Sequence, residues 1–394
     1  MTQQKERNNQ VVVLPSWYPD KLNKFAGDFI KRHIIAISEL HSQYIIYVVK
    51  DEFAKITKDV FIEMNVTDRY TEKIIYYHSI KTGIKLIDKL LSQIKFNQLY
   101  FTALNEYVKT NGIPALIHVH VILKAGLIAL WAKRKWNIPF IISEHWSVFL
   151  EEANYKAKDL PVFYQWAIKR ILKNAIALTT VSDRLGKAIM KKYNAPRYTV
   201  IPNVVDHYIF FPGHKNHNES LQIIHASNMV YEKNIESILK AFVILKKNKF
   251  AAVLHLFGPA PGSIKLLSKE LGLDDTVFFR DEVDQDVLAY EMQQSDALLL
   301  YSRFETFGCV LIEANAVGIP VIVSELPVFH ELIAENLNGM FVEADNSEAL
   351  ANKLIEFGKL RESFDKNQIV VSTHKFSFSN VAIQFDKLYG KLIT

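Results

Sequence analysis

Short apolar runs alternate with amphipathic stretches through the first half of the chain. An uninterrupted run of three to six apolar residues is typical of a buried strand, and apolar residues at spacings of three and four are typical of a helix. The expected strands cover residues 11–14, 44–49, 117–121, 140–142, 177–181 and 199–201, and the expected helices cover 28–40, 124–136 and 161–174. This alternation predicts a parallel sheet with helices on both faces.

The second half repeats the same alternation. Strands are expected at 222–226, 252–257, 276–279, 297–300 and 321–323, and helices at 234–246, 263–271, 286–294, 308–317 and 347–357. A polar stretch at 213–220 is the best candidate for a linker, and Val381, Phe385, Leu388 and Leu392 mark a last helix within 376–394. The pattern therefore predicts two α/β domains in one chain.

The most informative chemistry lies in the segment between the strands at 297–300 and 321–323. Its loop carries Glu305, and a turn at Phe307 and Gly308 opens a helix that carries Glu313. The first N–H groups of a helix lack partners and the helix dipole is positive there, so this turn and Cys309 suit a phosphate. A carboxylate such as Glu313 can accept two hydrogen bonds from a ribose diol.

This segment resembles the signature of the retaining glycosyltransferases of family 4, the glycogen-synthase-like group 1 enzymes. The matching residues are Ser302, Glu305, Phe307, Gly308, Glu313, Ala314, Ala316, Gly318, Pro320 and Val321. The resemblance implies the GT-B architecture, in which two Rossmann-like domains face each other across a cleft. It implies an acceptor-side domain over 1–205, a nucleotide-sugar domain over 206–375, and a final helix, 376–394, that returns to the first domain.

The resemblance also assigns roles to other residues. Lys233 would neutralise the donor diphosphate. Asn228 stands where relatives carry an arginine, a second positive charge for the phosphates. Gly258 would lie near the nucleotide, and Val283, with Glu282, would hold the base through the backbone. Ser182 and Asn203 match landmarks near the end of the first domain.

In the first domain, His145 follows the strand at 140–142, where relatives place a histidine that faces the transferred sugar, and Glu144 could orient its ring. Gly27 would place the acceptor or a phosphate at a helix start, although a plain turn with Asp28 capping that helix explains it nearly as well. His118 and His120 alternate along a strand and share one side. His-x-His can bind a metal, but the sequence shows no third ligand at a suitable spacing. A structural role is therefore expected for both, with His120 a candidate for the acceptor site and no metal site.

Composition narrows the choice of partners and compartment. The chain has 394 residues, 49% of them apolar, one cysteine and a net charge of +5. The single cysteine excludes an intrachain disulfide, and the polar start lacks the apolar core of a signal peptide, so a cytoplasmic protein is expected. Basic segments at 85–95, 131–136 and 166–173 fit two interpretations: ordinary surface helices with a lysine-rich outer face, which are the commoner case, or peripheral contact with the inner membrane face. The charge is modest and dispersed, which argues against nucleic acid.

The sequence thus predicts a retaining, metal-independent hexosyltransferase. It would move a sugar from a nucleotide-diphosphate donor, with no other cofactor, to a glycan or lipid-linked acceptor, as in surface polysaccharide or lipopolysaccharide synthesis. Two alternatives stay open: a nucleotide-sugar epimerase on the same fold, and a catalytically silent nucleotide-binding subunit of a polysaccharide-assembly complex, which only Asn228 suggests.

Overall fold

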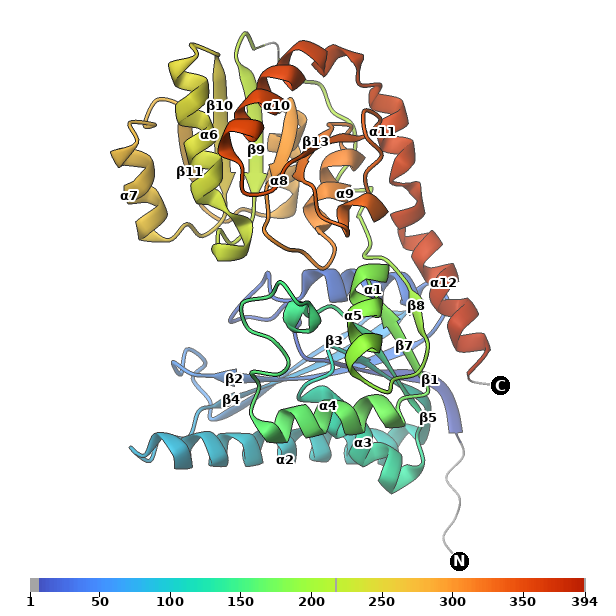
Figure 1. The fold of residues 1–394 in the computed structure, drawn as a ribbon. Coiled ribbons are helices and arrows are strands. Elements are labelled where there is room, and N and C mark those ends of the chain that lie inside the picture. The colour runs from blue at the N-terminus through green and yellow to red at the C-terminus, as the bar shows by residue number, and fades with distance from the viewer. Residues whose placement is uncertain (1–6, 217, 393–394) are drawn as a thin grey trace, which may run out of the picture. The chain divides into compact units, whose positions relative to one another are not determined.

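The chain forms two compact units in a computed structural model that describes residues 7–216 and 218–392 (Figure 1). The first unit ends at Asn203 and takes up the chain again at Val381, and the second runs from Val204 to Asn380. The chain therefore passes between the units twice, at 203–204 and at 380–381.

An eight-stranded sheet forms the centre of the first unit. Its strand order is β3-β4-β2-β1-β5-β6-β7-β8, and every neighbouring pair is parallel except β3 and β4. The strands are β1 (Arg7–Pro15), β2 (Gln43–Asp51), β3 (Val60–Val66), β4 (Tyr70–His78), β5 (Ile113–His120), β6 (Phe140–Glu144), β7 (Ala177–Thr180) and β8 (Tyr198–Val200).

Helices cover both faces of this sheet. One side carries α2 (Lys85–Asn111), α3 (Ala125–Trp136) and α4 (Val162–Asn174), and the other carries α1 (Asp28–Ser38) and α5 (Asp183–Lys192) (Figure 1). The last helix, α12 (Phe378–Gly390), adds its buried Phe385 and Tyr389 to this unit, where the Tyr389 hydroxyl lies 2.7 Å from Nδ1 of His118.

The second unit contains a fully parallel sheet of six strands in the order β11-β10-β9-β12-β13-β14. Its strands are β9 (Leu221–Ala226), β10 (Ala252–Phe257), β11 (Val277–Arg280), β12 (Ala297–Leu300), β13 (Val321–Ser324) and β14 (Gly339–Val342). Its helices are α6 (Ile235–Lys247), α7 (Gly262–Glu270), α8 (Gln285–Gln293), α9 (Cys309–Ala316), α10 (Ser347–Leu360) and α11 (Lys366–Ser372). The two-sheet α/β prediction is confirmed.

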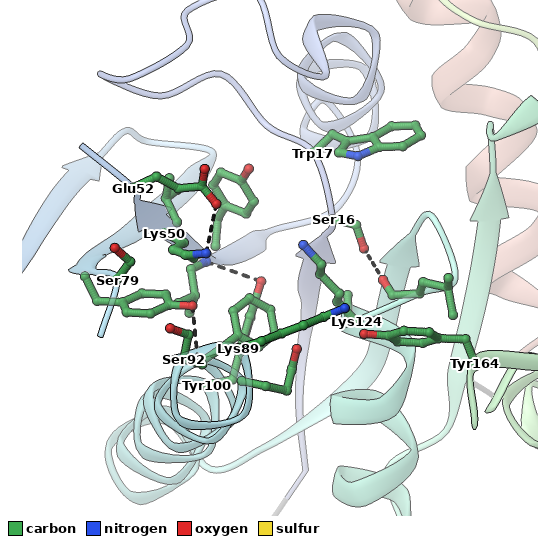
Figure 2. A pocket seen from close by; sticks show the side chains of 18 of the residues that line it. Ser16, Trp17, Lys50, Glu52, Ser79, Lys89, Ser92, Tyr100, Lys124 and Tyr164 are labelled. Atoms are coloured by element: carbon green, nitrogen blue, oxygen red, sulfur yellow. Dashed lines mark hydrogen bonds and ion pairs between the residues drawn. The ribbon is translucent and has the colours of Figure 1, made fainter. Parts of the chain in front are cut away.

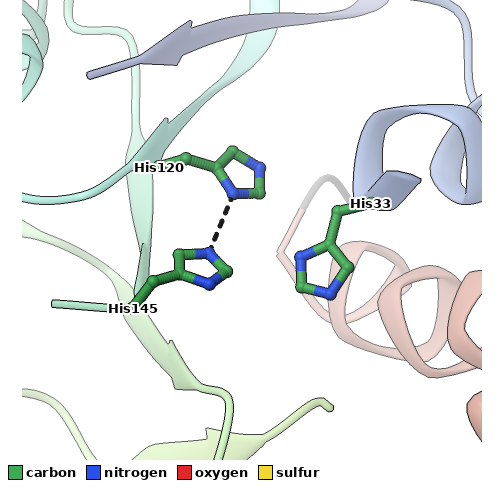
Figure 3. Close-up of side chains that lie close together, drawn as sticks. All are labelled: His33, His120 and His145. Carbon is green, nitrogen blue, oxygen red and sulfur yellow. Dashed lines mark hydrogen bonds between the residues drawn. The ribbon is translucent and has the colours of Figure 1, made fainter. Parts of the chain in front are cut away.

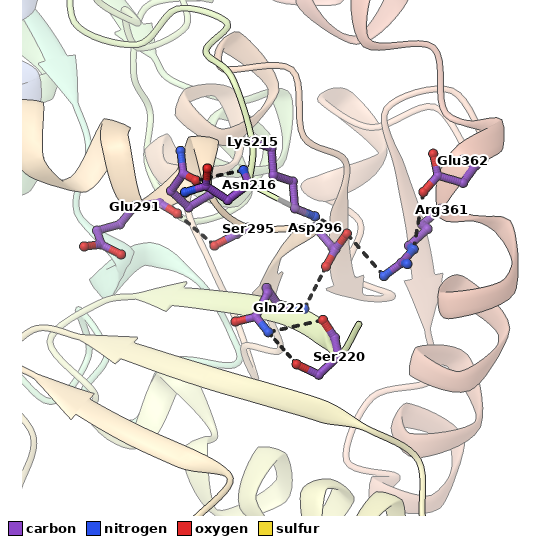
Figure 4. A network of polar contacts seen from close by, with 10 residues as sticks. Lys215, Asn216, Ser220, Gln222, Glu291, Ser295, Asp296, Arg361 and Glu362 are labelled. Carbon is purple, nitrogen blue, oxygen red and sulfur yellow. Dashed lines mark hydrogen bonds and ion pairs between the residues drawn. The ribbon is translucent and has the colours of Figure 1, made fainter. Parts of the chain in front are cut away.

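The polar stretch 213–220 is not the linker that its composition predicts, because its described part is tied to the second unit. Lys215 forms an ion pair with Asp296, and the N–H of Asn216 donates to the side-chain oxygen of Gln294 at 3.1 Å (Figure 4). The same Asp296 carboxylate accepts the N–H of Gln222 at 2.7 Å and lies 3.6 Å from Arg361. Polarity here reflects an anchored surface segment rather than a free connection.

Candidate functional site

The second sheet has a switch point between β9 and β12, because successive strands are added to one side of β9 and to the other side of β12. Ligands of open α/β sheets bind at the carboxyl ends of the strands beside such a point. The loop after β9 carries Lys233 and the loop after β12 carries Glu305. Although 72 positions separate them in the chain, the Lys233 ammonium and the Glu305 carboxylate form an ion pair.

This ion pair is shielded but not sealed. The Lys233 side chain is 21% exposed and that of Glu305 is 11% exposed. The Ser302 hydroxyl donates to the same Glu305 oxygen at 3.1 Å, and the Ser324 hydroxyl donates to the Ser302 carbonyl at 2.6 Å. The lysine and the glutamate neutralise each other, and their pairing fixes a cation at the carboxyl ends of β9 and β12.

Arg303 fixes the two loops to each other, a role that the sequence reasoning missed. Its backbone N–H donates to the Glu232 carbonyl at 2.8 Å, and its guanidinium lies 4.2 Å from the centre of the Tyr231 ring. The guanidinium also approaches Glu236 at 3.7 Å and Asp345 at 3.6 Å. Arg303 therefore holds the segment before Lys233 against the loop that bears Glu305.

The helix that follows this loop, α9, begins at Cys309 after Gly308, whose φ is +94°. A Cβ on Gly308 would lie 3.1 Å from Leu311 and 3.2 Å from Phe329, in a conformation that side chains rarely adopt. Gly308 and Cys309 are partly exposed, so the amide-bearing start of the helix is open to a ligand. Glu313 lies on the same helix with only 6% of its surface exposed.

Phe307, a predicted donor-binding residue, packs inside the second unit. Its side chain is 2% exposed, and its ring meets that of Phe376 edge to face with centroids 5.9 Å apart. It anchors the turn ahead of α9, and only its backbone is left for a ligand.

The remaining predicted donor-binding residues lie in the loops after β9, β10 and β11. Gly258 follows β10 with φ +120°, and a Cβ there would lie 2.0 Å from the Ser227 carbonyl oxygen. Only glycine therefore allows the loops after β9 and β10 to approach this closely. Asn228 is exposed in the first of these loops, and Val283 is partly exposed after β11.

In the first unit, Gly27 precedes α1 with φ +62°, and a Cβ there would lie 2.6 Å from the backbone carbonyl of Trp17. The glycine is thus required by a close approach of two backbone segments. Asp28 does not cap this helix as predicted. Gly27 occupies the cap position, and Asp28, in the first turn, forms an ion pair with Arg32 at 2.8 Å.

His145 and His120 form a buried cluster with a third histidine, His33 of α1 (Figure 3). One ligand nitrogen from each lies within 4.8 Å of the others, and His120 Nδ1 lies 3.3 Å from His145 Nε2. The expectation that His120 has no third partner is therefore corrected. No sequence spacing could reveal His33, because it comes from a helix far away in the chain.

The chemistry of His33 favours a ligating role. Its Nε2 lies 2.9 Å from the Pro202 carbonyl, which can only accept, so Nε2 carries the proton and Nδ1 keeps a lone pair. His33 Nδ1, His120 Nε2 and His145 Nδ1 have no hydrogen-bond partner among the described residues. Burial lowers the pKa of His33 to about 4, so the ring is neutral at pH 7. Three neutral imidazoles could hold a divalent cation such as Zn²⁺.

Glu144 does not orient the ring of His145. Its carboxylate instead accepts the backbone N–H groups of Ile122, His145 and Trp146 at 2.9–3.0 Å. Burial raises the pKa of Glu144 to about 7, against the opposing effect of these three donors. Glu144 therefore shapes the loop that presents His145.

A cavity of about 1340 Å³ opens at the switch point of the first sheet, between β1 and β5 (Figure 2). The Ser16 hydroxyl, which follows β1, donates to the Val121 carbonyl at 2.8 Å and so joins the two strand ends. Five lysines line the cavity against two acidic residues: Lys50, Lys81, Lys85, Lys89 and Lys124 against Glu52 and Asp88. The excess of positive charge in this lining suits an anionic ligand.

Comparisons with known proteins agree with this architecture. The family model described as "Glycosyl transferases group 1" matches residues 209–369, and "Glycosyltransferase Family 4" matches residues 70–208. Together they span most of the chain, which belongs to the group 1, family 4 glycosyltransferases.

Particular relatives share this family at low identity. The alpha-monoglucosyldiacylglycerol synthase of Streptococcus pneumoniae is 25% identical over 63% of this chain and 60% of its own length. The matched region spans 58–61% of the first three curated relatives. Sucrose-phosphate synthase from Thermosynechococcus elongatus has the same fold, with a TM-score of 0.79 at 19% identity over 98% of this chain and 99% of its own. Anabaena HepE in complex with UDP and glucose follows at 0.72, with 15% identity over 97% and 99%.

Proposed function

We propose that this protein transfers a hexose, with retention of anomeric configuration, from a nucleotide-diphosphate sugar to a hydroxyl group of a lipid-linked or glycan acceptor. The observation that carries the proposal is the ion pair of Lys233 and Glu305 at the switch point, beside the open start of α9. Family membership and the HepE complex with UDP and glucose support a nucleotide-sugar donor.

The ion pair would exchange partners when the donor binds. The diphosphate takes the ammonium of Lys233 and the amides at Gly308 and Cys309, which releases Glu305 to accept hydroxyls of the sugar. As the bond between sugar and diphosphate breaks, negative charge grows on the leaving phosphate, and groups already aimed at it stabilise that charge. Lysine and backbone amides supply this charge neutralisation, so the proposed transfer needs no metal at the diphosphate.

One further residue completes the donor site in this proposal. Glu313, on the second turn of α9, holds the ribose diol, and its burial strengthens a hydrogen bond to a hydroxyl.

Retention follows if the acceptor attacks the face from which the diphosphate leaves. The acceptor oxygen then forms the new bond to the anomeric carbon while the bond to the phosphate oxygen breaks, and that phosphate oxygen takes the acceptor proton. No protein nucleophile takes part in this sequence. The acceptor would be a growing surface polysaccharide or lipopolysaccharide on a lipid carrier, in line with the Salmonella typhimurium relative named as an O-antigen chain mannosyltransferase.

The test measures release of nucleoside diphosphate from a panel of UDP-, GDP-, ADP- and dTDP-sugars, with and without polyprenyl- or diacylglycerol-linked acceptors. We expect release with one donor class, stimulated by a lipid-linked acceptor, and a product whose anomeric configuration by NMR equals that of the donor. Tight nucleotide binding without release under every combination would contradict catalysis. An inverted product would contradict the proposed geometry of attack.

A further inference from the structure

The three helices on one face of the first sheet have a larger positive net charge than the whole protein. Helices α2, α3 and α4 together carry ten lysine and arginine residues against two acidic residues, a net charge of +8. The entire chain has a net charge of +5, so everything outside these helices sums to −3. These three helices lie on one side of the first sheet (Figure 1), so the net positive charge that looks dispersed along the sequence lies on that side.

Large apolar side chains stand in solvent at the start of α2. Leu86, Leu90 and Ile94 are 79%, 60% and 52% exposed, and their spacing of four residues places them in one row along the helix. Lys85 and Lys89, both exposed, alternate with this row. Leaving three such side chains in water is unfavourable, and no packing within the described part of the protein offsets it.

Helix α4 repeats this arrangement with aromatic residues. Val162, Phe163 and Trp166 are 81%, 58% and 52% exposed, and the rings of the last two lie 6.0 Å apart. The same helix continues with exposed Lys169, Arg170 and Lys173, and it contains no acidic residue. Trp and Phe beside lysines are the side chains that settle at the boundary between lipid headgroups and acyl chains.

We infer that the face formed by α2, α3 and α4 is a docking surface for an anionic membrane. Apolar residues would enter the acyl boundary, while lysine and arginine ammonium and guanidinium groups reach the negative headgroups. None of the helices in the described part of the chain is long and apolar enough to cross a bilayer. Nucleic acid would account for the charge but leaves the aliphatic row unexplained.

The position of the lysine-lined cavity agrees with this surface. The first turns of α2 contribute Lys85 and Lys89 to its lining, and the start of α4 contributes Pro161 and Tyr164 (Figure 2). The cavity thus opens beside the same helix starts that carry the exposed apolar residues.

Sedimentation of the full chain with vesicles tests the surface. We expect binding to vesicles of equal parts phosphatidylcholine and phosphatidylglycerol, and little binding to phosphatidylcholine alone. Leu86→Ser combined with Leu90→Ser should weaken binding to the anionic vesicles by more than about tenfold. Lys169→Gln with Lys173→Gln should weaken it by at least about tenfold and flatten its dependence on salt.

The second unit supplies matched controls on α7. Leu266 is 58% exposed, close to the value for Leu90, and Lys265 and Lys269 are exposed on the same helix. Leu266→Ser and the Lys265→Gln, Lys269→Gln pair should bind vesicles like the unmodified protein. Equal losses in both sets, or no preference for anionic vesicles, would overturn the docking surface. Nucleoside diphosphate binding without vesicles should be unchanged in every variant, so a failed surface leaves the proposed donor site standing.

Discussion

Replacing Lys233 with alanine tests the donor site most directly. The ammonium is held by Glu305 in a place that is only 21% exposed, so its contact with a phosphate would be partly shielded from water. A hydrogen bond to a charged group contributes about 1.5–3 kcal/mol, which corresponds to roughly 10–150-fold weaker binding of nucleoside diphosphate. If Lys233 also stabilises the leaving phosphate in the transition state, turnover should fall by about 10²–10³-fold.

The glutamate left behind adds to this effect. Without its lysine, Glu305 keeps the Ser302 hydroxyl at 3.1 Å but faces the incoming diphosphate as an uncompensated negative charge. Lys233→Ala should therefore be more damaging to nucleotide affinity than Lys233→Ala combined with Glu305→Gln. Isothermal titration with nucleoside diphosphates measures affinity, and release of diphosphate from the sugar donor measures turnover.

Lys215 provides the matched control in the same unit. It pairs with Asp296 much as Lys233 pairs with Glu305, with side-chain exposures of 31% and 7%. Lys215→Ala should lower thermal stability, because Arg361 at 3.6 Å is then the one charged partner of Asp296 among the described residues, yet it should leave nucleotide affinity unchanged. Equal nucleotide affinity and turnover in Lys233→Ala and the unmodified protein would refute the assignment. So would equal losses in the two lysine variants.

Three further outcomes follow from the geometry. Gly308→Ala should lower the melting temperature and weaken diphosphate binding, because φ is +94° and the new Cβ would lie 3.1 Å from Leu311; unchanged calorimetry and titration would contradict this. Glu313→Gln should raise the dissociation constant for the nucleotide about tenfold while binding of inorganic pyrophosphate is unaffected, since only the ribose contact weakens. Burial lowers the pKa of His33 and of His225 to about 4 from 6.5, so the unfolded chain binds more protons below pH 6.5. Stability should therefore fall as pH drops from 6.5 towards 4, and thermal scans of His33→Gln should show a shallower loss over that interval.

Most strongly apolar strands could be predicted from the sequence, although β4, whose residues 74–77 are buried, was missed along with the exposed edge strand β3. The run at 297–300 matches β12, and 252–257 matches β10, because both strands are covered on two faces by helices. β3 was missed because its side chains are all exposed or half-buried, which leaves no apolar run to recognise. Helix α2 (Lys85–Asn111) was recognised only over 85–95, as a basic amphipathic segment. Its leucines have the spacing of a buried helix face, yet Leu86 and Leu90 are exposed.

In the candidate site, too, the sequence identified single residues but not the contacts between them. Resemblance named Lys233 and Glu305 one by one, but their contact depends on the neighbouring positions of β9 and β12, which only the folded sheet sets. His33 was invisible because it joins its partners through three-dimensional packing. Arg303 was missed because an arginine that braces two loops has no distinguishing sequence pattern.

The placement of α12 has a consequence for how the protein matures on the ribosome. Phe385 and Tyr389 are fully buried in the first unit, yet all of the second unit is translated before them. The nascent first unit must wait with an uncovered apolar patch over His118 while about 180 residues emerge, and only the second unit can close its core promptly. Deleting α12 should accordingly harm the half of the protein made first, and a chaperone that shields that patch would favour correct folding.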